Sequence, residues 1–279
     1  MPAQIERERR SIDVRASAIL TYCGGQGDGD RGNLDAVLRW LAGQRDLETI
    51  VVEQGDRPRL VAPAAHPDAR VVFAFREGPL RKGWGRNVGA RHASGDVLLF
   101  GDADVIVPGG LANAAAQCSA RYEVVKPHGR LVALTPEETA HVREHGPDGT
   151  RPDGGGSRGR GEDPGGRQVL CEGWFAIRRD AFEAIGGFDE RIAGSLAQDE
   201  SVSLKVELAR LSTCALDDRP ALRLCGSRPQ QTASARGDAA SDAALLDAYA
   251  RCDDAARARV AAVARQLHGR RDKYAPDAR

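Results

Sequence analysis

Short apolar runs in this chain alternate with segments long enough to cross over a sheet. The runs are SAILTY (17–22), TIVVEQ (49–54), RVVFAF (70–75) and VLLF (97–100), each bounded by turn residues. Parallel strands need such crossover connections, whereas antiparallel strands are often joined by tight hairpins. The alternation therefore predicts an α/β fold, in which a mostly parallel central sheet is flanked by helices.

Helices are predicted between and after these runs. Asn33 suits an N-cap, Gly43 suits a C-terminal stop, and an i, i+3, i+4, i+7 apolar stripe lies between them. The stripe consists of Leu34, Val37, Leu38 and Leu41. Later in the chain we expect a strand over 169–177 and helices over 179–185 and about 198–211.

Composition favours one large domain with appendages, for which 279 residues suffice. We divide the chain into a charged leader (1–16), a main domain (17–230) and a C-terminal helical tail (231–279). Within the main domain, residues 147–167 are rich in Gly, Arg, Asp and Pro and too polar to be ordered alone. We interpret them as a flexible loop, either a cover over a ligand crevice or an insertion without a role.

Charge and hydropathy exclude several classes of partner. The 40 basic and 40 acidic side chains cancel, so no overall field attracts nucleic acid or an anionic membrane. No stretch reaches the roughly 20 apolar residues of a transmembrane helix, and the N-terminus is charged where a signal peptide is apolar. We therefore predict a cytoplasmic protein with no transmembrane segment and no nucleic-acid partner.

The cysteines are scattered along the chain, without the close pairs that structural zinc sites use. They are Cys23, Cys118, Cys171, Cys214, Cys225 and Cys252. In a cytoplasmic protein we expect these thiols to be reduced and mostly buried.

Two carboxylates follow the fourth apolar run directly, in the segment LLFGDADVIVP (98–108). Ligands of an open parallel sheet bind at the carboxyl ends of its strands, so Asp102 and Asp104 are expected to face a crevice. Carboxylates at i and i+2 can hold a divalent cation, directly or through water, and the cation can neutralise a pyrophosphate. A polar turn without a ligand is the alternative interpretation.

A second motif competes with this one. Gly27, Gly29 and Gly32 form a GxGxxG between a predicted strand and a predicted helix, and Glu53 follows about 20 residues later, as in the dinucleotide-binding fingerprint. The alternative function is thus an NAD(P)-binding Rossmann-type oxidoreductase. Asp28 and Asp30 count against it, because they place two negative charges where a pyrophosphate would bind.

Three sequence blocks taken together indicate a protein family more specifically than the two-carboxylate motif or the GxGxxG motif alone. They are Arg86-Asn87-x-Gly89 within GPLRKGWGRNVGARHASGD (78–96), the DADxIxP segment (102–108), and GGFDE (186–190) before an acidic cluster. In this order and spacing, about residues 17–210 resemble the family-2 glycosyltransferases and the related galactosyltransferase-type catalytic domain, which has the GT-A fold. The main domain would then be a GT-A catalytic domain.

The resemblance implies a metal-assisted glycosyltransferase of the hexosyltransferase type. It would move a sugar from a nucleotide diphosphate donor, with a UDP-sugar favoured, to a carbohydrate or small-molecule acceptor, with Mn²⁺ or Mg²⁺ as the cofactor. The implied donor-binding residues are Thr21, Tyr22, Glu53, Arg86, Asp102 and Asp104. Asp102 and Asp104 would hold the ribose and the metal, with Asp104 favoured as the direct ligand.

On the acceptor side, the resemblance implies roles for Gly173, Trp174 and Glu200. A bare glycine backbone admits a sugar ring, and an indole can stack on its face, although a buried core tryptophan is an alternative. Asp199 is the implied general base, which takes the acceptor proton from the face opposite the leaving diphosphate. Inversion of the anomeric configuration would follow.

The chain departs from the family pattern in two respects. Gln198 replaces the glutamate that commonly precedes the base, and Ser201 replaces a later acid. The late-strand stretch ALRLCGSRP (221–229) lacks a histidine that often binds the metal in relatives. Either His128 or Cys225 could substitute for it, or metal binding could be weaker, and a degenerate, non-catalytic nucleotide-binding GT-A protein is a further alternative.

Overall fold

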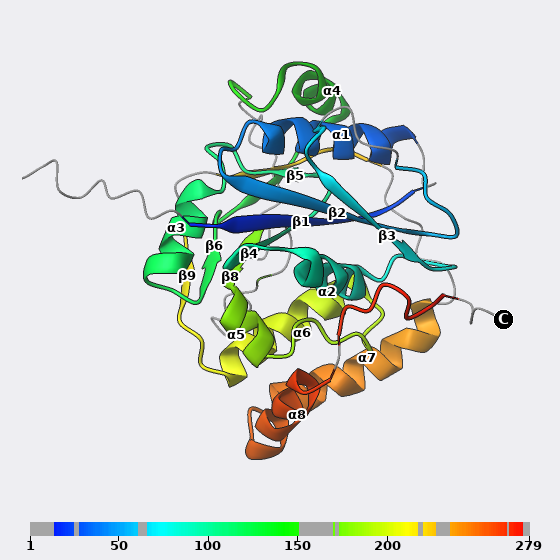
Figure 1. Cartoon of the computed structure of the whole chain (residues 1–279), viewed down its shortest axis with the longest axis vertical. Coiled ribbons are helices and arrows are strands. Elements are labelled where there is room, and N and C mark those ends of the chain that lie inside the picture. Colours follow the sequence, from blue (N-terminus) through cyan, green and yellow to red (C-terminus); the bar gives the residue numbers. More distant parts are fainter. Residues whose placement is uncertain are drawn as a thin grey trace, which may run out of the picture.

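A seven-stranded sheet forms the centre of the part of the chain that this computed structural model describes (Figure 1). The structure describes residues 14–24, 28–60, 66–150, 170, 173–216, 220–226, 235–266 and 268–275. In sheet order the strands are β3 (Arg70–Phe75), β2 (Leu47–Gly55), β1 (Ala16–Cys23), β4 (Val97–Gly101), β8 (Phe175–Arg178), β6 (Val124–Lys126) and β9 (Thr213–Ala215). The strands β1 to β4 pair in parallel, β8 is antiparallel to both neighbours, and β9 is parallel to β6. The predicted α/β fold with a mostly parallel sheet is confirmed.

A small second sheet and the helices surround this centre. Among the described residues, the second sheet consists of β5 (Val105–Ile106), β10 (Ala221–Arg223) and β7 (Leu131–Ala133). The helices are α1 (Asp28–Ala42), α2 (Lys82–His92), α3 (Ala112–Ala120), α4 (Pro136–His145), α5 (Arg179–Ala184), α6 (Ser195–Leu208), α7 (Ala235–Ala250) and α8 (Asp254–Ala264). In Figure 1, α1 and α4 lie on one side of the large sheet, and α2, α5 and α6 lie on the other, with α7 and α8 beyond them.

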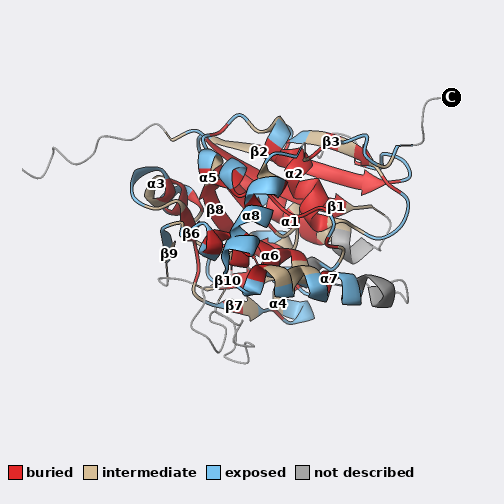
Figure 2. Ribbon diagram, turned by 90° about the horizontal axis from the view of Figure 1, so that it is seen from below, coloured by how far each residue is buried: buried red, intermediate tan, exposed pale blue. Residues whose placement is uncertain are grey.

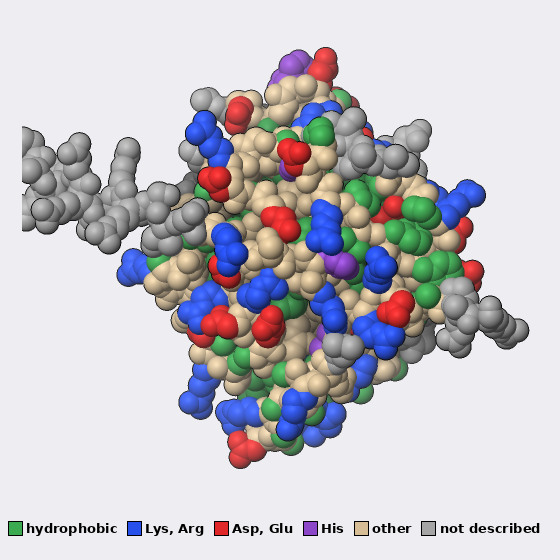
Figure 3. Space-filling model, in the orientation of Figure 1, with side chains coloured by type: hydrophobic (Ala, Val, Ile, Leu, Met, Phe, Trp, Pro, Cys, Tyr) green, Lys and Arg blue, Asp and Glu red, His purple; other side chains and the backbone are tan. Residues whose placement is uncertain are grey.

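The alternation of side chains along β1 explains this layering. Ala18 and Leu20 point to the core that α1 covers, while Ile19 points to the core beneath α5 and α6. All three side chains have no exposed area, and the central strands are buried along their length (Figure 2). A strand that is covered on both faces is apolar along most of its length, and the run SAILTY (17–22) predicted this strand for that reason. On the outer surface, the face drawn in Figure 3 carries acidic and basic side chains interspersed with each other.

The start of α1 differs from the prediction. The helix begins at Asp28 rather than after Asn33, so Gly29 and Gly32 lie within its first turns, while Gly27 is outside the described residues. The predicted end before Gly43 is correct. The dinucleotide-binding interpretation is wrong, because β4 is followed in the sheet by the antiparallel strand β8, whereas a doubly wound dinucleotide-binding sheet continues with parallel strands.

Asn33 is not an N-cap, because it lies inside α1, and its side-chain amide has tertiary partners instead. Its Nδ2 donates to Cys225 O at 3.3 Å, and its Oδ1 accepts from Arg143 NH2 at 2.8 Å. The side chain therefore joins α1 to α4 and to the segment after β10. Sequence spacing alone cannot distinguish such a buried asparagine from a cap.

Helix α2 lies unusually close to the sheet. A Cβ atom added at Gly89 would lie 2.3 Å from Ile19 Cγ2, and one added at Gly85 would lie 2.3 Å from Gln54 Nε2. These glycines allow the helix backbone to approach β1 and β2, and residues 82–90 are all buried. The charged side chains of α2 are consequently held inside the molecule.

Strand β8 is shorter than predicted and begins at Phe175. Gly173 has a φ of +86°, which favours glycine and takes the backbone out of the extended conformation. The amides of Gly173 and Trp174 donate to side chains instead of to a neighbouring strand. The predicted helices over 179–185 and 198–211 are present as α5 and α6, with shifted ends.

The C-terminal segment returns to α2 after α8. Trp84 Nε1 donates to Arg270 O at 2.9 Å, and the Tyr274 ring packs edge-on against the Trp84 ring with centroids 4.9 Å apart. Gly269 N donates to Glu190 Oε1 at 2.7 Å. The end of the described chain thus covers the outer side of the helix that lies on the sheet.

The remaining predictions have mixed outcomes. The five described cysteines are free, but only Cys118 is buried, so the expectation of mostly buried thiols is wrong; Cys171 is outside the described residues. No described helix combines the length and apolar character needed to cross a membrane. Residues 151–167 of the predicted loop and 1–13 of the leader lie outside the described residues. The division into leader, main domain and tail stays a prediction.

Candidate active site

The carboxyl end of β4 presents the two carboxylates identified in the sequence. Asp102 follows the strand directly, and its Oδ2 accepts a hydrogen bond from Gly173 N at 3.1 Å. Asp104 precedes β5, and its backbone oxygen accepts from Leu224 N at 2.8 Å. The antiparallel pairing of β5 with β10 therefore fixes the Asp104 backbone against a late strand.

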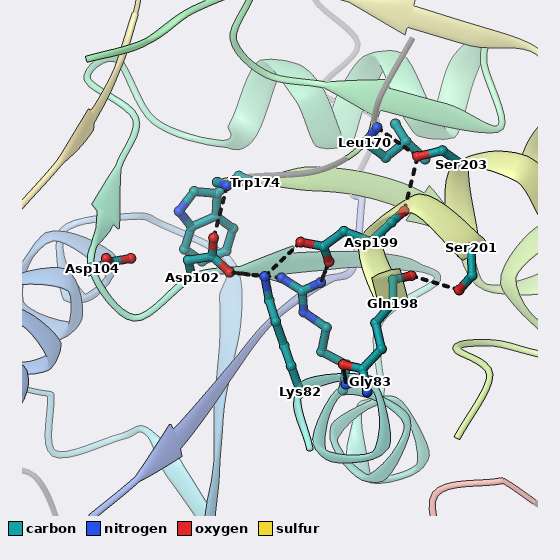
Figure 4. A network of polar contacts seen from close by, with 12 residues as sticks. Lys82, Gly83, Asp102, Asp104, Leu170, Trp174, Gln198, Asp199, Ser201 and Ser203 are labelled. Carbon is teal, nitrogen blue, oxygen red and sulfur yellow. Dashed lines mark hydrogen bonds and ion pairs between the residues drawn. The ribbon is translucent and has the colours of Figure 1, made fainter. Parts of the chain in front are cut away.

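Two cations from α2 lie between Asp102 and Asp199. Lys82 Nζ is 2.7 Å from Asp102 Oδ1 and 2.9 Å from Asp199 Oδ2. Arg86 Nη1 is 2.7 Å from Asp199 Oδ1, and its Nη2 is 3.0 Å from Asp102 Oδ1. Lys82 and Arg86 are one helical turn apart, so both reach the same side of α2. Figure 4 shows Lys82 directed between Asp102 and Asp199. The network joins β4, α2 and α6.

This network is shielded from water. The side chain of Asp199 is 3 % exposed and that of Arg86 is 2 % exposed. Burial alone would raise the pKa of Asp102, but Lys82 and Arg86 outweigh it and hold that pKa well below its usual range. Burial and the neighbouring Arg86 would lower the pKa of Lys82, but Asp102 and Asp199 outweigh them and raise it. Lys82 and Asp102 are therefore both charged at neutral pH.

Asp104 differs from Asp102 in its surroundings. Its side chain is 43 % exposed, and its nearest cation is Arg223, whose Nε is 4.0 Å from Asp104 Oδ2. Partial desolvation and the negative charge of Asp102 raise the pKa of Asp104 to about 6. Asp104 thus offers an accessible carboxylate, whereas both oxygens of Asp102 already accept hydrogen bonds.

The described side chains do not form a metal site by themselves. No group of three or more His, Cys, Asp or Glu side chains in the described residues could hold a metal ion. His128 is 1 % exposed, and its Nε2 accepts from Trp174 N at 3.2 Å. Burial and the nearby Lys126 lower the pKa of His128 to about 4, so its ring is neutral at pH 7. Cys225 is exposed and follows Leu224, whose backbone N–H donates a hydrogen bond to Asp104 O.

The donor set nevertheless fits one kind of cation site. Mg²⁺ and Mn²⁺ are commonly held by one or two carboxylates together with phosphate oxygens of the substrate. Asp104 can supply such a carboxylate from a partly exposed side chain, whereas Asp102 would have to release Lys82, Arg86 or Gly173. The residues present therefore fit a cation shared between Asp104 and a diphosphate.

The expected nucleoside residues lie at the carboxyl ends of β1 and β2. Thr21 and Tyr22 are 6 % and 8 % exposed. Glu53 has no exposed area, and its carboxylate accepts from the backbone amides of Arg59 and Leu60 at 2.7 to 3.1 Å. The carboxylate of Glu53 thus holds the 56–60 loop.

The expected acceptor residues are only partly brought together. Gly173 adjoins Asp102 through its amide, but Trp174 has no exposed area, and its Nε1 donates to Val105 O at 2.8 Å. The Trp174 ring packs edge-on against Trp40, so the predicted stacking of an acceptor sugar on this indole is wrong. Glu200 is exposed on α6, beside the buried Asp199.

Sequence reasoning missed Lys82 and Arg223. Lys82 precedes Arg86 by four residues on a predicted helix, and this spacing was the available signal that both would reach one site. Arg223 lies in the late-strand stretch that lacks a histidine, and its Nη2 is 3.9 Å from Asp102 Oδ2. Three cations, Lys82, Arg86 and Arg223, therefore adjoin three carboxylates.

The chain matches a known family over most of this site. Residues 31–186 match the model described as Glycosyl transferase family 2. This span includes α2, β4 and both carboxylates after β4. No curated protein was found that matches the chain in sequence.

Solved structures of glycosyltransferases share its architecture. The mannosyltransferase PcManGT from Pyrobaculum calidifontis, in complex with GDP-Man and Mn²⁺, has a TM-score of 0.52 and 16 % identity over 90 % of this chain and 73 % of that one. S. aureus TarS 1–349 in complex with UDP-GlcNAc has a TM-score of 0.57 and 16 % identity, over 90 % and 70 % of the two chains. GalNAc-T7 with UDP, GalNAc and Mn²⁺ has a TM-score of 0.53 and 14 % identity, over 85 % and 50 %. These similarities establish the GT-A fold.

Proposed function

Because the chain belongs to glycosyl transferase family 2, whose members are enzymes that transfer sugars, we propose that it moves a hexose from a nucleoside diphosphate to an acceptor hydroxyl. The observation that carries this proposal is the meeting of Asp102, Asp104 and Asp199 with three cations at the carboxyl end of β4. A UDP-sugar is our first choice of donor, because two of the three similar structures hold a uridine nucleotide. TarS holds UDP-GlcNAc and GalNAc-T7 holds UDP, whereas PcManGT holds GDP-Man.

The charge balance of the site supports metal assistance. The cations Lys82, Arg86 and Arg223 offset the three carboxylates, so an entering diphosphate meets no excess positive charge from these residues. Mn²⁺ or Mg²⁺ on Asp104 would restore the balance and stabilise the departing diphosphate. Asp102 would keep Arg86 and Lys82 directed toward the phosphates, and Thr21 and Tyr22 would frame the nucleoside, with Glu53 fixing the loop beside it.

The acceptor side centres on Asp199. Each of its oxygens accepts from one cation, and a carboxylate oxygen has a second lone pair that can receive a proton. The hydrogen bonds from Lys82 and Arg86 fix the orientation of the Asp199 carboxylate, which a general base needs. Direct displacement would then invert the anomeric configuration, with Gly173 and Glu200 bordering the acceptor.

The test measures nucleoside diphosphate release from a panel of UDP- and GDP-hexoses with Mn²⁺, first with water as the acceptor. We expect at least one donor to be turned over, more slowly in EDTA. Turnover should fall strongly in Asp104→Asn and Asp199→Asn. If no donor is turned over although UDP or GDP binds, the protein binds nucleotides without transferring sugars and the proposal is wrong.

A further inference from the structure

Gln198 connects α6 to the start of α2. Its Oε1 accepts from Gly83 N at 2.6 Å, and its Nε2 donates to Ile192 O at 2.6 Å. The side-chain amide is 1 % exposed. Gly83 N can only donate and Ile192 O can only accept, so these partners require a side chain that does both.

The contact with Gly83 fixes the turn that carries Lys82. The first amides of a helix have no partner within the helix, and Gln198 satisfies the amide directly after Lys82. Gln54 holds the preceding residue, since its Oε1 accepts from Arg81 N and its Nε2 donates to Arg81 O, both at 3.0 Å. A Cβ atom at Gly83 would lie 3.2 Å from Gln198 Cδ, so glycine permits this close approach.

We propose that Gln198 is a positioning residue for sugar transfer, which holds Lys82 between the donor-side Asp102 and the acceptor-side Asp199. This inference rests on the proposed function. Gln198 and Asp199 are adjacent on α6, so the same helix turn that supplies the base also fixes the cation that pairs with it. The position of Lys82 is therefore set from α6 as well as from α2.

The geometry also explains why this chain has glutamine before Asp199 where a glutamate was expected. A glutamate could still accept from Gly83 N. Its other oxygen would face Ile192 O at the present 2.6 Å, where two acceptors repel each other. Substitution toward the expected glutamate should therefore displace the first turn of α2 and the Lys82 ammonium.

The test compares Gln198→Glu and Gln198→Met with wild type, and uses Gln266→Glu, an exposed glutamine after α8, as the control. The probe is the UDP- or GDP-hexose that the wild type hydrolyses, and calorimetry with Mn²⁺ and the matching diphosphate measures donor binding. We expect kcat to fall on the order of tenfold to a hundredfold in both Gln198 variants, because catalysis is sensitive to misplacement by about 1 Å. Donor affinity should stay near that of the control.

A double-mutant cycle separates positioning from a general loss of structure. In a Lys82→Met background, Gln198→Glu should have little further effect on kcat, because the residue it positions is gone. An equal fold-loss in both backgrounds, or unchanged kcat in both Gln198 variants, would overturn the role of Gln198. Absence of turnover in the wild type would instead overturn the proposed function, and with it this inference.

Discussion

Asn87 and Glu190 are hydrogen-bonded to each other in the interior, with Asn87 Nδ2 2.9 Å from Glu190 Oε1. Asn87 belongs to the RNxG block and Glu190 ends the GGFDE block, so two segments that carried the family resemblance form one unit. The same carboxylate accepts from Gly269 N at 2.7 Å and from Lys273 Nζ at 2.6 Å. The C-terminal segment is thereby tied to the helix that carries Lys82 and Arg86.

This relationship predicts graded effects at Glu190. Glu190→Ala leaves one N–H of the Asn87 amide and the Gly269 amide without their acceptor, although Asn87 keeps its bond to Phe188 O, and should lower the free energy of unfolding by about 3 kcal/mol. Glu190→Gln keeps an acceptor oxygen and loses only the ion pair with the partly exposed Lys273, so about 1 kcal/mol is expected. Urea denaturation measures both values, with the exposed Glu183→Gln on α5 as the control. A Glu190→Ala variant as stable as the control would contradict this role.

A second prediction concerns the buried Lys205. Its side chain has no exposed area, its Nζ donates to Gly187 O, and burial lowers its pKa from 10.5 to about 8. The native state thus loses this proton before the unfolded state does, and the charged form destabilises the protein below pH 8. That cost, about 3 kcal/mol, should fade as the pH rises from 8 to 10.5.

Lys205→Met removes the titrating group while keeping most of the apolar volume. The variant should be more stable than wild type at pH 7, by less than the full 3 kcal/mol because the hydrogen bond to Gly187 O is lost. The difference should shrink between pH 8 and pH 10. Denaturation curves at pH 7, 8.5 and 10 measure it, and a difference that grows with pH would contradict the predicted sign.

The strands and the position of the two carboxylates after β4 could be predicted from the sequence because local pattern determines them. A central strand buried on both faces must be apolar along its length, and Asp102 follows such a run directly. The partners of Asp199 could not be predicted in this way. Lys82 and Asp199 are separated by 117 residues, and their contact depends on how closely α2 lies on the sheet and α6 on α2.

Trp174 and Asn33 illustrate a second limit. Tryptophan occurs both at sugar-binding surfaces and in protein cores, and asparagine occurs both at helix N-caps and in the interior. In each case the neighbouring residues of the folded chain decide which role the side chain takes. Trp174 is buried because Val105 O accepts its indole N–H and Trp40 packs against its ring. Asn33 lies inside α1, where Arg143 and Cys225 satisfy its side-chain amide. Both sets of partners come from other segments of the chain.

A third prediction tests the proposed base. Asp199→Asn should reduce turnover on the order of a hundred- to ten-thousand-fold, because the acceptor proton loses its recipient. Affinity for the nucleoside diphosphate should be retained or increased, since Lys82 and Arg86 lose a competing carboxylate. Glu207→Gln, an exposed carboxylate on the same helix, serves as the control. Transfer near the wild-type rate in Asp199→Asn would show that Asp199 only neutralises the cations.

Calorimetry of UDP binding, with GDP in parallel, tests the central claim that the carboxylates after β4 bind a nucleoside diphosphate through a divalent cation. We expect one of the two nucleotides to bind more tightly in Mn²⁺ than in EDTA, because Asp104 and the phosphates repel each other without a cation. Asp104→Asn should remove this difference, whereas Asp247→Asn, an exposed residue on α7, should retain it. Equal affinity in Mn²⁺ and EDTA, or an undiminished difference in Asp104→Asn, would contradict the account.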